Sequence, residues 1–157
     1  MISQTTEYAL RAVVWLASHP DRALTAQQIA AATRVPAGYL AKVLQGLSRA
    51  GLLHSQRGLG GGFTLARPAS ELSIWEVVQA VDPIRRIREC PLGFELHKDR
   101  LCALHQELDE AVNRIEKQFT KRTIASLIDE SADSVPLCAF TPKAKSRPVK
   151  NGRRAKR

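Results

Sequence analysis

The chain of 157 residues is 44% hydrophobic and carries a formal net charge of +9, from 24 basic and 15 acidic side chains. This length accommodates one compact domain with an appendage, but no second full domain. No apolar run approaches the ~20 residues that span a bilayer, and residues 4–8 are polar where a signal peptide would become apolar. We therefore expect a cytoplasmic protein that has no membrane partner.

The excess of positive charge is concentrated at the C-terminus. Eight of the basic residues and no acidic residue lie between positions 141 and 157, so the rest of the chain is nearly neutral. Net charge alone is therefore a weak argument for DNA binding by the folded part. We expect residues 131–157 to form a disordered basic tail, which either is simply solvated or adds sequence-independent phosphate contacts.

Two short helices are expected after a first helix over residues 4–18. Thr25 and Gln28 have the spacing of a capping box, which predicts a helix that starts at Thr25 and ends near Ala32. Pro36 suits the first position of the next helix, and Gly51 suits its end. The apolar side chains of this second helix recur at helical spacing and form one buried stripe, made of Leu40, Val43, Leu44 and Leu47.

A glycine-rich stretch, Arg57-Gly58-Leu59-Gly60-Gly61-Gly62, follows these helices. Glycine lets the backbone turn tightly and approach a partner, and Arg57 places a guanidinium beside it. Strand-like runs at 52–56 and 63–65 predict a β-hairpin, not the strand-to-helix layout of a nucleotide-phosphate loop. Two short helices and a hairpin together indicate a winged helix-turn-helix, whose second helix can enter the major groove of DNA. The alternative is that both are packing units of another small domain.

The residues beyond the hairpin predict a homodimer. Ser73 and Glu76 form a second capping box, which opens a helix through Val81. After a loop at 84–101, a long amphipathic helix is expected from about Leu101, with a last turn at 123–128. Its apolar stripe is too long for this domain to cover, so we expect it to pack against its copy. The stripe consists of Leu104, Leu108, Ala111, Val112, Ile115 and Phe119.

The expected fold is mainly α with a small β-hairpin wing, in four parts. Residues 1–83 form the winged helix-turn-helix domain, and residues 84–103 form a Cys/His sensor loop. Residues 104–130 form the dimerisation helix with its terminal turn, and residues 131–157 form the tail. A two-fold symmetric dimer of this kind would present two recognition helices to a palindromic operator in double-stranded DNA.

Thiol and imidazole groups gather around the start of the long helix. Cys90, His97, Cys102 and His105 have the spacing Cys-x6-His-x4-Cys-x2-His. The helix dipole at Cys102 favours thiolate, the form that binds metals. Two sulfur and two nitrogen donors suit Zn(II) or an iron–sulfur cluster with mixed ligands. An odd number of cysteines argues against a disulfide framework, and Cys138 fits the role of a small apolar residue.

Several motifs carry a resemblance to a known family: Glu7-Tyr8-Ala9-Leu10, Tyr39-Leu40, Gly51-Leu52 and the Arg57-Gly58-x-Gly60-Gly61-Gly62 wing. With these motifs the chain resembles the IscR, NsrR, RirA and CymR group of bacterial dimeric repressors, the Rrf-two family, over about residues 1–130. The resemblance implies transcription regulation. It also implies a sensor of iron–sulfur status, iron, redox stress or nitric oxide, with a cluster between the long helix and the partner's first helix.

The resemblance further implies ligand positions. Cys90 and Cys102 match two of the three cysteines of cluster-binding members, whereas Leu96 occupies the middle position. His105 matches a histidine ligand of the IscR branch, and Glu7 falls where the NsrR branch uses a carboxylate from the other subunit. The leading hypothesis is a [2Fe-2S] cluster, for which zinc or a metal-free thiol sensor are the alternatives. Its proposed ligands are Cys90, Cys102 and two of His105, His97 and Glu7.

For DNA, the resemblance places Arg57 in the minor groove, where a narrow A·T tract attracts an arginine. We expect Thr25 and Tyr39 to bind phosphates and so to fix the register. The complete predicted contact set is Thr25, Gln27, Gly38, Tyr39, Lys42, Gln45, Arg57, Gly58 and Gly60. A zinc enzyme is not expected, because no acid/base partner is recognisable. An architectural DNA protein that acts through the basic tail is a further alternative.

Overall fold

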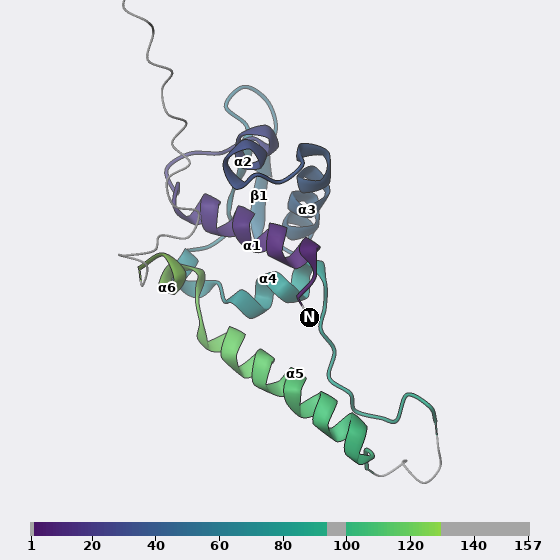
Figure 1. Ribbon diagram of the computed structural model, residues 1–157. Helices are drawn as coiled ribbons and strands as arrows, with labels where there is room; N and C mark the ends of the chain where they lie inside the picture. The colour runs from purple at the N-terminus through teal and green to yellow at the C-terminus, as the bar shows by residue number, and fades with distance from the viewer. Residues whose placement is uncertain (1, 94–99, 130–157) are drawn as a thin grey trace, which may run out of the picture.

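The computed structural model describes residues 2–93 and 100–129 and is mainly helical, with one two-stranded sheet (Figure 1). This architecture confirms the predicted fold class. The helical elements before the hairpin are α1 (Gln4–Ala17), α2 (Ala26–Thr33) and α3 (Ala37–Arg49), and the strands are β1 (Leu53–Gln56) and β2 (Gly62–Leu65). A 3-10 turn η1 (Ala69–Glu71), α4 (Ile74–Val81), α5 (Ala103–Lys121) and α6 (Ile124–Asp129) follow.

Side chains at the helix starts fix where the helices begin. Both predicted capping boxes form: Thr25 accepts a hydrogen bond from the backbone N–H of Gln28, and Ser73 accepts one from that of Glu76. Each box satisfies backbone donors that the first helical turn leaves unpaired. At α1 the hydroxyl of Ser3 accepts from the Thr6 N–H and plays the same part, although the sequence pattern did not single it out.

The core lies between α1 and the pair α3 and α4, with α2 and β1 closing its sides (Figure 1). The predicted apolar stripe of α3 is buried in it, because residues at i, i+3, i+4 and i+7 share one face of a helix. Leu40, Leu44 and Leu47 are fully buried, and Ile29 and Val77 meet them from α2 and α4. The helix-turn-helix is therefore held as one rigid unit.

The hairpin has the predicted position and an antiparallel register in which Leu53 faces Leu65 and Gln56 faces Gly62. Leu24, two residues before α2, exchanges two backbone hydrogen bonds with Phe63, of 2.8 and 3.1 Å, so the start of α2 is tied to β2. Gly58 and Gly60 have φ values of 96° and 77°, in the left-handed region that favours glycine. The glycines thus permit the tight tip.

Helix α5 extends beyond the body of the domain (Figure 1). Its one buried residue is Asp109, whereas Leu104 is 65% and Leu108 47% exposed. After α5 the chain turns back, and α6 packs on α1 and η1, with Ile124 buried. The predicted long helix and terminal turn are confirmed within a few residues. None of the helices in the described ranges is both long and apolar enough to cross a membrane.

Candidate DNA-binding face and sulfur–imidazole site

The exposed side of α3 and the hairpin form one continuous face. Lys42 and Gln45 point away from the buried stripe of α3, and Arg57 is exposed where β1 enters the hairpin tip. Between α3 and the hairpin lies a groove of about 430 Å³. Its lining is mostly polar and includes two guanidinium groups. The lining residues are Gln45, Ser48, Arg49, Ser55, Arg57 and Phe63. A cationic groove beside an exposed helix suits the phosphate backbone of a duplex.

The other predicted DNA contacts lie on or near this face. Thr25 and Gln27 are exposed at the start of α2, and the Thr25 hydroxyl, which accepts from Gln28, keeps its own proton for an outside acceptor. Gly38 is exposed at the start of α3, and a Cβ placed there would meet nothing within 4 Å. Gly58 and Gly60 form the hairpin tip, so their backbone can approach a partner closely.

Tyr39 has contacts that the sequence pattern did not reveal. Its hydroxyl lies 2.5 Å from the Thr5 hydroxyl, and its ring meets that of Tyr8 edge to face, with centroids 5.7 Å apart. The guanidinium of Arg11 lies 5.8 Å from the centre of the Tyr8 ring. The start of α1 is thereby connected to the start of the recognition helix.

Three further side chains lie on the candidate DNA-binding face but are absent from the predicted contact set. Arg49 follows Gln45 by four residues and Lys42 by seven, so the helical period already placed it on their side of α3. Ser55 lies in β1, paired with Phe63, and its position follows from the strand register. Leu59 is fully exposed at the hairpin tip between two glycines, where an apolar group can meet base edges or sugars.

Cys102 and His105 come together at the start of α5. The Cys102 sulfur lies 3.4 Å from His105 Nδ1, and Cys102 is the N-cap residue of the helix. A thiolate and an imidazole that share one helix face can act as two ligands of one metal ion or cluster. The chemistry of this donor pair therefore fits the predicted zinc or iron–sulfur group.

Of the other predicted ligands that the structure describes, neither Cys90 nor Glu7 joins that pair within a single chain. Among the described residues, no three His, Cys, Asp or Glu side chains are grouped so as to hold a metal ion. Glu7 is bound to Arg11, with 2.5 Å between Oε1 and Nε, and Arg11 also donates to the Thr33 carbonyl at 3.1 Å. His97 lies outside the described residues, as do Cys138 and the basic tail, so the predictions made for them stay predictions.

A salt bridge joins the loop after α4 to α5. Arg86 donates from Nε and Nη2 to the two carboxylate oxygens of Asp109, at 2.6 and 2.5 Å, and from Nη1 to Asn113 Oδ1 at 2.8 Å. Asp109 also accepts the backbone N–H of Ile87 at 2.9 Å. The hydrogen bonds from Arg86 lower the pKa of Asp109, despite desolvation, and the Ile87 N–H lowers it further. The ion pair between Arg86 and Asp109 thus holds the loop on α5.

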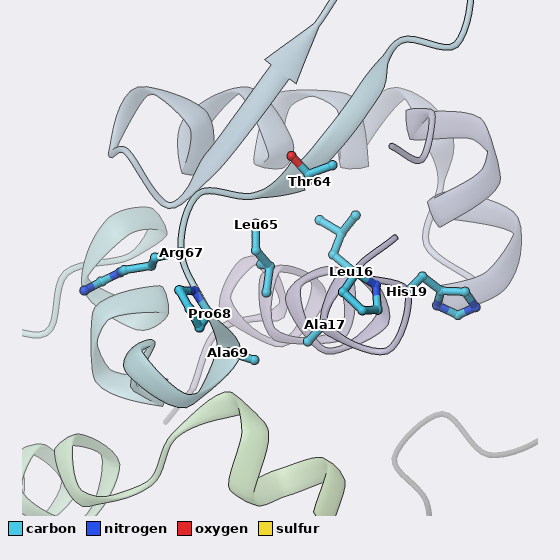
Figure 2. Close-up of a pocket in the computed structure, with 9 residues that line it drawn as sticks. Leu16, Ala17, His19, Thr64, Leu65, Arg67, Pro68 and Ala69 are labelled. Carbon is cyan, nitrogen blue, oxygen red and sulfur yellow. The ribbon is translucent and has the colours of Figure 1, made fainter. Parts of the chain in front are cut away.

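A second cavity, of about 380 Å³, lies at the end of α1, where α1 meets β2 and the segment that leads to η1 (Figure 2). The walls are mostly apolar, and Arg67 at one side is paired with Glu76. It contains no residue of α2 or α3 and none of the candidate ligands. The lining residues are Leu16, Ala17, His19, Pro20, Thr64, Leu65, Arg67, Pro68 and Ala69.

Comparisons with known proteins agree with this geometry. The profile of the Rrf2 family, described as an iron-dependent transcriptional regulator, matches residues 2–130. A protein of Aquifex aeolicus (strain VF5), named as an HTH-type transcriptional regulator, is 31% identical over 132 residues, which are 82% of this chain and 92% of the relative. The fold is similar to that of T. potens IscR, at a TM-score of 0.68 and 22% identity over 83% of this chain and 87% of that one. It is also similar to CymR, the global cysteine regulator of B. subtilis, at a TM-score of 0.69 and 20% identity over 83% and 98%.

Proposed function

The chain belongs to the Rrf2 family of DNA-binding transcriptional regulators, and we propose that it acts as a homodimeric repressor on a palindromic operator. The prediction that it is not an enzyme is confirmed, because the family and the Aquifex relative are described as transcriptional regulators. Within each protomer, α3 enters the major groove while the hairpin carries Arg57 towards the neighbouring minor groove. The observation that supports this best is the cationic groove between α3 and the hairpin, with Arg49 and Arg57 on its walls.

The proposed dimer forms along α5. Leu104, Leu108 and Ile115 are exposed large apolar side chains at a spacing that keeps them on one side of the helix. Contiguous exposed apolar surface of this kind is characteristic of association between subunits. On this basis we propose that the chain has four parts. They are the DNA-binding domain at 1–83, the sensor loop at 84–103, the dimerisation helix with its last turn at 104–130 and the tail at 131–157.

The proposed sensor is an iron–sulfur cluster, of the [2Fe-2S] type, at the start of α5. Its ligands are Cys90, Cys102 and two of the three side chains His105, His97 and Glu7 of the partner subunit. The 3.4 Å contact between the Cys102 sulfur and His105 Nδ1 supports this proposal, since it brings a soft and a borderline donor together. Such a cluster supplies a group whose occupancy and oxidation state respond to iron and oxidants.

The contacts of Glu7 support a proposed route for the signal. Its carboxylate binds Arg11, which donates to the Thr33 carbonyl at the end of α2 and lies over the Tyr8 ring, and that ring in turn meets Tyr39 of α3. A change at Glu7 therefore reaches the helix-turn-helix through four packed side chains. We propose that DNA affinity differs between the two states of the sensor because Arg11 has different partners in them.

The test is anaerobic reconstitution with ferrous iron and sulfide, followed by visible absorption spectroscopy. We expect a coloured protein, and we expect Cys102→Ala to remove the colour while the helical circular dichroism is unchanged. A colourless protein that instead binds stoichiometric zinc would contradict the cluster and favour the zinc alternative. A colourless protein that binds neither would favour a thiol or ligand sensor, a possibility that the fold similarity to a cysteine regulator supports.

A further inference from the structure

The placement of charge on α5 is inverted relative to an ordinary amphipathic helix. Its leucines are exposed, yet Asp109 is 9% exposed and is the one buried residue of the helix. Asp109 accepts three hydrogen bonds, two from the fork of Arg86 and one from the Ile87 N–H. A buried carboxylate is tolerated only when it is paired and hydrogen bonded, and here every donor comes from the loop that carries Cys90.

The residues that meet this loop share one narrow side of α5 with the two candidate ligands. At 3.6 residues per turn, Cys102, His105, Asp109, Asn113 and Glu116 fall within an arc of about 80°. Arg86 contacts Asn113 at 2.8 Å and lies 3.7 Å from a Glu116 oxygen, in addition to its bonds with Asp109. The apolar stripe of α5 occupies the neighbouring side. The helix therefore has one side for association and another for the loop.

The direction of the loop is fixed by these contacts. Arg86 reaches Asp109, Asn113 and Glu116, while the next residue, Ile87, bonds Asp109 alone, so the chain advances towards the N-terminal end of α5. In Figure 1 the segment that leaves α4 likewise descends towards that end of α5. The loop runs antiparallel to the helix, and each further residue brings it closer to Cys102.

The loop from Ile87 to Cys90 and the helix from Asp109 to Cys102 cover similar lengths. Cys90 follows Ile87 by three positions, which is about 10 Å of extended chain. Cys102 precedes Asp109 by seven positions, which is about 10 Å of helix. Cys90 then begins a turn, in which its carbonyl accepts the Gly93 N–H at 3.0 Å. The loop therefore has the length to carry Cys90 towards the N-terminal end of α5, where Cys102 and His105 lie.

We propose that Arg86 and Asp109 are positioning residues that set the register of the loop on α5 and so bring Cys90 to the end of the helix that carries Cys102 and His105. The pair holds the loop near the ligands before any metal is bound. Among the described residues the three donors do not form one group, so Cys90 still has to close on the other two. This inference rests on the proposed sensor for its purpose. Its geometric content, the proximity of two thiols, can be tested without a metal.

The first experiment measures thiol proximity in the metal-free, full-length protein that carries Cys138→Ala. Diamide, a thiol oxidant, should convert Cys90 and Cys102 to an intramolecular disulfide, detected by peptide mass mapping, because such a bond requires Cα atoms within ~7 Å. We expect Arg86→Ala to slow this reaction, Arg86→Lys to slow it less, and Arg85→Ala, which replaces the exposed neighbour, to leave it unchanged. Asp109→Asn, which keeps the shape of the side chain, serves where Arg86→Ala fails to fold.

The second experiment measures zinc affinity by competition with a chelator. We expect Arg86→Ala to weaken binding about 10–100-fold, as loss of an outer partner does at other metal sites, and Arg85→Ala to bind like the wild type. Equal oxidation rates in the wild type and Arg86→Ala, or a disulfide between chains, would overturn the inference. If the wild type forms the intramolecular disulfide at a rate that depends on Arg86 but binds neither zinc nor a cluster, the register stands and the proposed sensor fails.

Discussion

At the scale of single residues, Arg57 and Thr25 carry the account of DNA binding. Arg57 stands where β1 ends and the glycines begin, so its guanidinium is exposed to solvent on a backbone that can itself come close to DNA. Thr25 combines two tasks in one hydroxyl, since it accepts the Gln28 N–H and still has a proton to donate. A substitution of each residue has a separate expected effect.

Arg57→Ala should weaken operator binding by about 1–3 kcal/mol, roughly 5–150-fold, because an arginine in a narrow groove makes both a charge interaction and hydrogen bonds. Fluorescence anisotropy with a labelled duplex, repeated across salt concentrations, measures the affinity and its salt dependence. Arg114→Ala is the matched control, since that arginine is exposed on α5, away from the DNA-binding face. Equal losses in both variants would mean that Arg57 acts only through net charge.

Thr25→Ala and Ser73→Ala remove the two capping boxes and should each lower the free energy of unfolding by about 1 kcal/mol. Denaturant unfolding measures this loss. The two variants should differ in DNA binding, because Thr25 lies at the start of the helix-turn-helix and Ser73 opens α4 on another side of the core. The account of Thr25 as a phosphate contact fails if both variants bind DNA with the same affinity.

At the scale of elements, the Arg86–Asp109 pair joins the loop to α5 and makes the stability depend on pH. Arg86 holds the pKa of Asp109 below its ordinary value, so the pair contributes stability that is present above the unfolded-state pKa of ~3.9. That stability is lost as the pH falls from there through the lower pKa of the folded state.

Asp109→Asn should therefore destabilise the metal-free protein at pH 7, and the difference from the wild type should shrink as the pH falls below ~3.9. Urea unfolding at a series of pH values measures this difference. Glu107→Gln is a suitable control, because Glu107 is exposed on the same helix. A difference that stays constant from pH 7 to pH 3 would show that Asp109 contributes through shape and not through charge.

The elements themselves were predictable from the sequence because their signals are local. Capping boxes, the i, i+3, i+4 stripe of α3 and the glycine hairpin each depend on residues within a few positions of one another. Asp109 was not predictable in this way. Its partner Arg86 is 23 positions earlier, in a loop without periodicity, and the pattern of α5 alone presents Asp109 as one more charged residue on a solvated side. Only the folded chain identifies it as the buried residue.

At the scale of the whole molecule, the sequence predicted a cluster of four donors, but the described part of one chain brings together two of them, Cys102 and His105. Sequence spacing fixes donors on a single helix turn and does not fix the distance between a loop and a helix. A ligand from a second chain, as proposed for Glu7, is invisible to spacing altogether. Whether the site is complete therefore depends on whether the chain forms the dimer.

Leu108→Ala should weaken the dimer. Each buried leucine contributes about 1.5–3 kcal/mol, and a symmetric interface contains two copies, so the dimer dissociation constant should rise roughly a hundredfold or more. Sedimentation equilibrium measures this constant, and Lys117→Ala, on the opposite side of α5, should leave it unchanged. An unaltered dimer would mean that association uses another surface.

The most direct test of the central claim is selection of DNA by the wild-type protein from a library of random duplexes at physiological salt. The account predicts an enriched sequence with two-fold symmetry, in which the two half-sites lie about one helical turn, or ~34 Å, apart, and which Arg57→Ala fails to enrich. Enrichment of a sequence without symmetry, or retention of all duplexes equally, would contradict a dimer that presents two recognition helices and two arginine wings to an operator.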